Sequence, residues 1–593
     1  MNDTPTEPLR EVELKGIAVS PGVAVGTALL VTTEEDRLVE RTITEEEIPR
    51  EIARFEEALI QTRHQIHEIQ QKVSTAIGQE SASIFDAHLL VVDDRSFVEE
   101  VIRGLNAKRR NVEAVLTGVA ERYAEALLAL EDDYLRERAA DVRDVTRRIL
   151  RNLSGRSTSL LSRLDQPYVI VANDLAPSDT AVLNRDRVMG FATDLGSPTS
   201  HTAIMARALG IPAVVGLHDV SVRVSTGDQL LIDGHKGIMV INPSRERLEL
   251  YGKIAEVRQG IQDKLAALKD QPAVTRDGYQ VMLAANIEQP ADVDSLMAHG
   301  AGGVGLYRTE YLYLSMKDLP TEDEQAAVYE EVVQRVAPAA ATIRTLDLGG
   351  DKFLSHLKMP AEMNPFMGWR AIRFCLAQPE IFKAQLRAIL RASRHGNVKL
   401  MYPMVSNVDE VLRANSFLEE AKDDLRQRGV PFDDNLEVGV MIEVPSAAIT
   451  ADLIAPHVDF FSLGTNDLVQ YTLAVDRVNE RVAYLYEPTH PAIIKLIKNT
   501  IDIGHQHGIW VGICGEMAAN PVMAPLLMGL GIDEFSMSPS AVPLVKHVVR
   551  SLKFPQAEEL AKTALPSSSA TEVQNLCRQL IEKVAPEILE LLA

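Results

Sequence analysis

The sequence has few of the features that mark secreted or membrane proteins. Its 593 residues include only three cysteines, Cys375, Cys514 and Cys577. Three cysteines cannot build a disulfide framework, so they predict a reducing, cytoplasmic environment. No apolar run approaches the ~18 residues of a membrane span, and we expect no membrane insertion. The segment from Met1 to Lys15 is polar and acidic, unlike a secretory or mitochondrial leader.

Basic residues are also fewer than acidic residues. The chain has 61 Lys and Arg against 84 Asp and Glu, which gives a formal net charge of −23. A chain this acidic is a poor ligand for nucleic acid, but it attracts basic protein partners.

Hydrophobic residues make up 46% of the sequence. The length is typical of roughly four globular domains, or of fewer if one of them is a large barrel.

The first half of the sequence changes from a strand pattern to a helix pattern and back. Glu13–Val31 is strand-like, whereas proline and glycine are scarce in Thr44–Arg151, where Ile52, Phe55 and Leu59 share one helix face. We predict about four helices there, packed as a bundle. Strand-like runs then return at 168–171, 188–192, 213–215 and 230–232. This order predicts a mixed β/α domain with a helical bundle inserted into it.

The second half repeats one pattern, in which a short apolar run ends in polar residues or glycine and a helical segment follows. The runs span 281–287, 303–306, 342–348, 399–405, 438–444, 460–463, 510–513 and 534–537. About eight strand–helix units predict a (β/α)8 barrel, with a doubly wound open sheet as the alternative. In such a barrel the catalytic residues lie at the C-terminal ends of the strands.

Arginines lie at or shortly after several of these predicted strand ends. They are Arg308, Arg344, Arg370, Arg373 and Arg477. A single arginine of this kind is usually a surface ion pair. A set of them at one barrel mouth indicates a bound phosphate or carboxylate, because the guanidinium group binds both bidentately.

Acidic residues and a cysteine follow other predicted strands. Glu443 and Asp467 end two neighbouring runs, and a pair of carboxylates there indicates a hard cation, Mg²⁺ or Mn²⁺. Cys514 ends another run. A lone cysteine is more often a small buried hydrophobe, but a thiol, with a pKa of ~8.5, can also serve as a general acid near neutrality.

One histidine of the first half stands where a helix is predicted to begin. His201 follows the turn Gly196–Ser200, and either Thr199 or Ser200 would cap the helix. Most single histidines are structural. Here the free N–H groups of a helix N-terminus favour an anion, and an imidazole nitrogen is a good nucleophile for a phosphoryl group. We therefore identify His201 as a candidate phosphoryl acceptor.

Four motifs resemble those of the PEP-utilising enzymes. Thr199–Arg207 is similar to the phosphohistidine segment of that family. The segments 440–445, 462–468 and 533–536 resemble its barrel motifs. The domain order and the segment Glu137–Asp144 resemble enzyme I of the phosphoenolpyruvate:sugar phosphotransferase system. The resemblance spans nearly the whole chain, and its motifs are long and specific.

The resemblance implies a fold and a reaction. The fold would be a multidomain α/β protein, in which a swivelling phosphohistidine β/α domain with an inserted α-helical bundle precedes a TIM-type (β/α)8 barrel. His201 would take the phosphoryl group from phosphoenolpyruvate and pass it to a histidine of the carrier protein HPr, with release of pyruvate. Thr180 would hydrogen-bond and orient the imidazole. The β/α domain would swing as a rigid body about the connections at 32–44, 153–165 and 243–272.

The resemblance also implies roles at the barrel mouth. The substrate-binding residues would be Arg308, Arg344, Asn466 and Arg477. Glu443 and Asp467 would hold Mg²⁺, with Mn²⁺ as a substitute. Cys514 would protonate the enolpyruvate as it becomes pyruvate.

The implied domain boundaries follow from the same comparison. Residues 1–38 and 156–243 would form the phosphohistidine domain, 39–155 the HPr-binding bundle, and 244–272 a linker helix. Residues 273–593 would form the barrel, which would bind phosphoenolpyruvate and make a homodimer. One departure is Ser197-Pro198, where many members have glycine and a basic residue. It removes a positive charge beside His201 and stiffens the turn.

Three other functions fit parts of the pattern. Pyruvate phosphate dikinase and PEP synthase share the histidine and barrel domains but need a nucleotide-binding domain, and only about 30 residues precede the bundle. A nitrogen-regulatory paralogue would carry an N-terminal sensory domain. A catalytically inactive scaffold would have no reason to combine His201, the arginines, Glu443 and Asp467.

Overall fold

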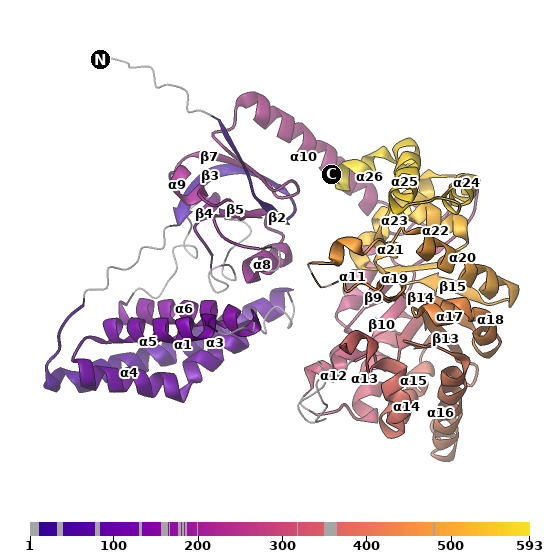
Figure 1. The fold of residues 1–593 in the computed structure, drawn as a ribbon, viewed down its shortest axis with the longest axis horizontal. Coiled ribbons are helices and arrows are strands. Elements are labelled where there is room, and N and C mark those ends of the chain that lie inside the picture. Colours follow the sequence, from indigo (N-terminus) through magenta and orange to yellow (C-terminus); the bar gives the residue numbers. More distant parts are fainter. Residues whose placement is uncertain are drawn as a thin grey trace. The chain divides into compact units, whose positions relative to one another are not determined.

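The chain forms two compact units. In this computed structural model they comprise Met1–Val257 and Arg258–Leu592, and the division falls within helix α10 (Arg245–Ala266). Figure 1 shows the elements of each unit. The structure describes residues 11–31, 40–77, 84–129, 133–155, 164, 166–175, 180, 183, 187–197, 200–316, 318–348, 364–477, 479 and 481–592.

An eight-stranded sheet forms the centre of the first unit. Its strand order is β1-β8-β7-β3-β4-β5-β6-β2. Strands β3 to β6 run parallel, and the flanking strands pair antiparallel. The strands are β1 (Val12–Lys15), β2 (Ile17–Ser20), β3 (Val23–Val31), β4 (Tyr168–Ala172), β5 (Val188–Thr193), β6 (Ala213–Val215), β7 (Gln229–Asp233) and β8 (Ile238–Ile241). The predicted runs become β4 to β7. The pattern missed β8, whose four residues are too few to show a period.

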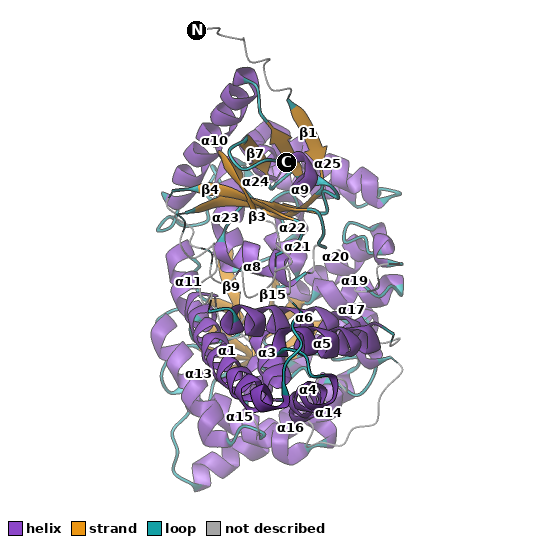
Figure 2. Cartoon of the chain, turned by 90° about the vertical axis from the view of Figure 1, so that its left-hand side faces the viewer, coloured by secondary structure: helices purple, strands orange, loops and turns teal. Residues whose placement is uncertain are grey.

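The inserted segment of the first unit is helical. It contains α1 (Ile48–Ile77), α3 (Ile84–Asp93), α4 (Arg95–Lys108), α5 (Val112–Leu128) and α6 (Asp133–Leu153), which pack against one another (Figure 2). Phe55 and Leu59 of the predicted stripe are buried in their common core. Residues 84–108 form two helices, which the pattern of apolar residues did not predict. Asp94 ends the first helix and caps the second, because its carboxylate accepts hydrogen bonds from the backbone N–H groups of Ser96 and Phe97 at 2.7 and 3.0 Å.

The second unit is a closed barrel of parallel strands. Its strands are β9 (Met282–Ile287), β10 (Val304–Arg308), β11 (Ala341–Arg344), β12 (Val398–Tyr402), β13 (Glu437–Ile442), β14 (Phe460–Leu463), β15 (Trp510–Ile513) and β16 (Glu534–Met537). Strand β16 pairs with β9 and closes the ring. The predicted barrel is therefore confirmed, and the open sheet is excluded.

Helices surround the barrel and extend beyond it. Around the strands lie α11 (Asp292–His299), α12 (Glu310–Ser315), α13 (Glu322–Val336), α14 (Ala371–Ala377), α15 (Pro379–Ser393), α16 (Val408–Gln427), α17 (Pro445–Ile449), α18 (Ala451–Ile454), α19 (Thr465–Leu473), α20 (Pro491–Gln506), α21 (Glu516–Ala519), α22 (Ala524–Leu530) and α23 (Val542–Ser551). The chain ends with α24 (Phe554–Ala564), α25 (Ala570–Val584) and α26 (Pro586–Leu592). None of the helices in the described part of the chain has the length and apolar character needed to cross a membrane.

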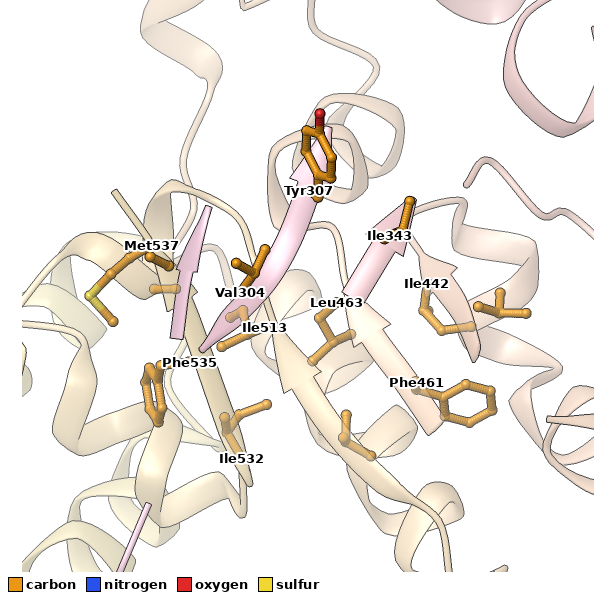
Figure 3. Packing of buried hydrophobic residues seen from close by; sticks show 14 of the residues in the cluster. Val304, Tyr307, Ile343, Ile442, Phe461, Leu463, Ile513, Ile532, Phe535 and Met537 are labelled. Atoms are coloured by element: carbon orange, nitrogen blue, oxygen red, sulfur yellow. The ribbon is translucent and has the colours of Figure 1, made fainter. Parts of the chain in front are cut away.

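Both faces of the barrel wall are packed. Outward side chains such as Ile343, Leu463 and Phe535 belong to the large core shared with the helices (Figure 3). A second cluster contains Leu306, Met401, Met441, Phe460 and Cys514, with Trp510 packed against it. A packed barrel is a rigid support rather than a pore, so its C-terminal mouth is where polar groups can meet a ligand.

Candidate active site

The strand ends of the second unit place the predicted residues at one mouth. Arg308 and Arg344 are the last residues of β10 and β11 and are direct partners in the parallel ladder. Glu443 follows β13, whose last residue, Ile442, pairs with Leu463 at the end of β14. Cys514 follows β15, the next strand of the ring. Adjacent parallel strands thus carry cationic, anionic and thiol groups to the same edge.

Arg344 is held by two carboxylates that the sequence analysis did not single out. One guanidinium nitrogen lies 2.8 Å from Oε1 of Glu310, and the other lies 3.2 Å from Oδ2 of Asp347. Burial opposes the charge of Arg344, but Glu310 and Asp347 outweigh burial and raise its pKa. Arg344 is therefore a permanent cation inside the protein.

Arg370 joins this network through Asp347. Its Nε and Nη2 donate to the two oxygens of Asp347, both at 2.9 Å, in a bidentate pair. Nη2 also lies 3.4 Å from Oδ2 of Asp467. The sequence indicated Arg370 as one of several arginines, and the structure connects it to both acidic groups.

Glu443 is a buried acid beside other acids. Its Oε1 accepts a hydrogen bond from the backbone N–H of Met404 at 2.6 Å, and the residue is 2% exposed. Burial and the nearby charges of Asp467 and Asp347 raise the pKa of Glu443 to about 8. A cation at this point would relieve that unfavourable burial of negative charge.

Several buried polar atoms at the mouth have no hydrogen-bond partner in the part of the chain that the structure describes. They are Nε of Arg344, Oγ1 of Thr465, Oδ1 of Asp467 and Nη1 of Arg477. Asp467 Oδ1 has only an ion pair with Arg477 Nη2, at 3.7 Å. Leaving a buried polar group unsatisfied costs about 1–3 kcal/mol. Four such atoms in one place indicate a polar ligand that completes their bonding.

The remaining predicted groups lie around these atoms. The amide of Asn466 is fixed by Glu516, whose backbone N–H donates to Asn466 Oδ1 at 2.8 Å. Arg308 pairs with Glu288 at 2.8 Å, and both side chains are partly exposed. Exposed pairs contribute little, so Arg308 can exchange Glu288 for a ligand.

Cys514 is buried with its thiol protonated. The thiol donates to the carbonyl oxygen of Leu463 at 3.6 Å. Burial raises the pKa of Cys514 to about 11, with a further contribution from Glu443, against the opposing hydrogen bond of Ser462. At neutral pH the group is a neutral thiol, which has a proton to donate.

His201 belongs to the first unit, where it begins helix α8 (His201–Leu209). Of the two predicted caps, Ser200 is the N-cap, and its hydroxyl accepts from the backbone N–H of Ala203 at 3.3 Å. The next residue, Thr202, donates to the carbonyl oxygen of Leu175 at 2.6 Å and fixes the first turn. Thr180 is fully buried in the same unit. Pro198, part of the unusual turn, lies outside the described residues.

Comparisons with known proteins cover both units. Three family profiles match, all described as PEP-utilising enzyme: the N-terminal part at 15–138, the mobile domain at 164–237 and the PEP-binding domain at 262–554. A phosphoenolpyruvate-protein phosphotransferase of Bacillus sp. (strain S) is 45% identical over 96% of this chain and 98% of its own. The chain belongs to the PEP-utilising enzyme family.

Two further proteins similar to this PEP-utilising enzyme are a sequence relative and a solved structure. The phosphoenolpyruvate-protein phosphotransferase of Haemophilus influenzae is 43% identical over 96% of this chain and 99% of its own. A solution structure of an Enzyme I protein is 42% identical over 42% of this chain and 99% of its own, with a TM-score of 0.37. The mobile-domain profile includes His201, and the PEP-binding profile includes the arginines and acids of the mouth.

The raised pKa of Glu443 predicts a titration that a surface glutamate would not show. With no divalent cation present, the ¹³C resonance of its carboxyl should titrate near pH 8, whereas ordinary glutamates titrate near 4.5. The signal should vanish in Glu443→Gln and persist in Glu437→Gln, a change at the opposite end of β13. A midpoint near pH 4.5 would contradict the effect of burial.

Proposed function

We propose that this enzyme transfers the phosphoryl group of phosphoenolpyruvate to His201 and then to a histidine of the carrier protein HPr. Pyruvate is released, and the reaction is the first step of a sugar phosphotransferase system. The set of unpartnered buried atoms on Arg344, Asp467 and Arg477 supports this most directly. The donors Nε of Arg344 and Nη1 of Arg477 suit a small substrate that has a phosphate and a carboxylate, whereas Oδ1 of Asp467 suits a cation, and all three atoms lie within the segment matched by the PEP-binding profile.

In this proposal the arginines bind the two anionic groups of the substrate. Arg344 and Arg477 have free donors facing the mouth, and Arg308 gives up a weak surface pair. Asn466 assists, since its amide is already oriented by Glu516. Bidentate guanidinium contacts would orient the phosphoenolpyruvate as well as bind it.

Mg²⁺ is the cofactor that the two acids suit. Among the described residues no three His, Cys, Asp or Glu side chains gather as a metal site. Glu443 and Asp467 would supply two carboxylates, and Mg²⁺ commonly takes its other ligands from substrate phosphate and water. When bound, the ion neutralises charge on the phosphate. The unpartnered Oδ1 of Asp467 and the raised pKa of Glu443 both fit a cation.

The chemistry consists of two separable events. An imidazole nitrogen of His201 attacks phosphorus, the N–P bond forms, and the bridging P–O bond breaks with its electrons left on enolpyruvate. Carbon 3 of the enolate then takes a proton from the Cys514 thiol, which later regains one from solvent. Thr180 would orient the imidazole. Because His201 and the mouth belong to different units, a swivel of the phosphohistidine domain is part of the proposal.

The helical bundle is proposed as the docking surface for HPr. A groove of about 750 Å³ lies between its helices, with Leu90, Phe97 and Tyr123 among its apolar residues and Asp94 and Glu100 among its acidic ones. Arg122 and Arg138 also line the groove, so its charges balance, and it is the apolar side chains that suit it to a protein partner. The net charge of −23 of the whole chain favours encounter with a basic partner.

A homodimer through the barrel unit completes the proposal. Leu412, Ile449 and Leu453 are exposed apolar side chains on α16, α17 and α18, and α18 packs against both other helices. Exposed apolar groups that gather on one face are typical of an association surface. A cytoplasmic location is supported by the three cysteines, all free and buried.

The first test concerns the nucleophile. His201→Asn removes the attacking nitrogen, so labelled phosphate from phosphoenolpyruvate should no longer be incorporated. His218→Asn is the matched control, because asparagine tolerates the positive φ of 66° at that position. Label should appear in the control at the wild-type level. Persistent labelling of His201→Asn would reject the assignment.

The second test concerns the cation. Glu443→Gln and Asp467→Asn each remove a hard anionic ligand, so the rate of phosphorylation should fall about 100-fold or more even at raised Mg²⁺. Glu437→Gln, on the same strand as Glu443 but at its other end, should keep the normal Mg²⁺ dependence. Normal turnover in either ligand variant would show that the metal lies elsewhere.

The third test separates protonation from phosphoryl transfer. Cys514→Ser should still phosphorylate His201, but it should release pyruvate with reduced facial selectivity at carbon 3. Phosphoenolpyruvate with isotopically distinct hydrogens on carbon 3, turned over in labelled water, reports this selectivity. Cys577→Ser, another buried thiol, should keep it. Unchanged selectivity in Cys514→Ser would exclude Cys514 as the proton donor.

A further inference from the structure

A continuous chain of buried hydrogen bonds lies behind β10 and β11. Gln385 on α15 is its centre, 1% exposed. Its Nε2 donates to Thr309 Oγ1 at 3.2 Å and to the hydroxyl of Tyr329 at 3.3 Å. Its Oε1 accepts from the backbone N–H of Leu346 at 2.9 Å. Both amide protons of Gln385 are donated, and its carbonyl oxygen accepts a hydrogen bond.

Two of these bonds reach the residues next to the substrate arginines. Thr309 directly follows Arg308, and its hydroxyl donates to the backbone carbonyl of Arg344 at 3.0 Å. Leu346 lies in the turn that carries Asp347, an acid that holds both Arg344 and Arg370. Gln385 therefore connects the last residues of β10 and β11 and the turn that follows β11.

The other end of the chain runs through Tyr329 to a second buried glutamine, Gln325. Tyr329 on α13 donates its hydroxyl to Gln325 Oε1 at 3.2 Å, and Tyr313 donates to the same oxygen at 3.0 Å. Gln325 Nε2 donates to the carbonyl oxygen of Pro320 at 3.0 Å. The backbone N–H of Leu346 can only donate, so it fixes which end of the Gln385 amide is the carbonyl oxygen, whether or not Gln325 is present.

We propose that Gln385 is a positioning residue that sets the spacing of Arg308 and Arg344 for phosphoenolpyruvate. The inference rests on the proposed function. Among the described residues Gln385 hydrogen-bonds no arginine side chain, and it would act through Thr309 and Leu346. Catalytic and binding groups must be held within fractions of an ångström, and a shift of about 1 Å can lower a rate about 100-fold. Side-chain amides behind the strands restrain such a shift more tightly than apolar packing does.

The chain contains a matched control for this role. Gln325 is equally buried, also bonds Tyr329, and lies on the adjacent helix, but its own bonds reach only tyrosine hydroxyls and Pro320. Gln385→Leu and Gln325→Leu make the same chemical change in neighbouring surroundings. Both should lower thermal stability. Gln385→Leu alone should disturb the strand ends.

The experiment measures single-turnover labelling of the full chain over a range of phosphoenolpyruvate concentrations. We expect Gln385→Leu to raise the half-saturating concentration about tenfold and to lower the apparent second-order rate constant about 100-fold. Gln325→Leu should keep the half-saturating concentration within about twofold. A purely structural role would reduce the amount of active protein and leave that concentration unchanged, so equal values in the two variants would overturn the inference.

A second pair of variants decides the outcome if Gln385→Leu does not fold. Thr309→Val removes the hydroxyl but keeps the shape, and Thr309→Ser keeps the hydroxyl. The valine variant should show the raised half-saturating concentration, and the serine variant should recover most of the wild-type value. Equal values in both would reject the proposal. Failure of the wild-type chain to take label would instead reject the proposed function, so the two failures are distinguishable.

Discussion

The positive charge of the barrel mouth must be balanced inside the protein before any substrate arrives. Arg344 and Arg370 are largely buried, and a buried cation without a partner is strongly unfavourable. Glu310 and Asp347 provide the balance and fix both guanidinium groups. On the guanidinium group of Arg344, only Nε is then left without a hydrogen-bond partner among the described residues. This charge compensation fixes the arginines of the proposed binding site before any substrate binds.

Much of this arrangement could be predicted from the sequence. The bounds of β14, β15 and β16 coincide with the predicted apolar runs. A strand that is buried on both faces has apolar side chains at successive positions, so its extent can be read from the sequence. Once the barrel is assumed, chain order alone brings Arg308, Arg344 and Glu443 to one edge. The local cap at Ser200 was also visible, because it needs only neighbouring residues.

Other features depended on contacts that have no sequence period. Glu310 and Asp347 stand beside Arg308 and Arg344 in the sequence, yet only the turn geometry shows that they hold Arg344. Gln385 lies on a helix far along the chain from Thr309, and a buried glutamine gives no signal among apolar neighbours. Asp94 divides the helical segment 84–108, because its carboxylate accepts hydrogen bonds from backbone N–H groups in place of backbone carbonyls. The spacing of apolar residues does not reveal this effect.

The same acids that hold the arginines also bear on how the phosphoryl group leaves. A phosphorylated imidazole is a dianion, and arginines that attract phosphoenolpyruvate would retain it if they had no other partner. Glu310 and Asp347 pair with Arg344, and Glu288 pairs with Arg308, so in the proposed reaction each of these guanidinium groups has an internal anion available when the phosphoryl group departs. The free energy gained when the substrate binds is then the difference between its ion pair with an arginine and the internal ion pair of that arginine. In the proposed reaction, a site built in this way would bind its anion firmly enough to react and would then release the phosphohistidine domain to meet its carrier.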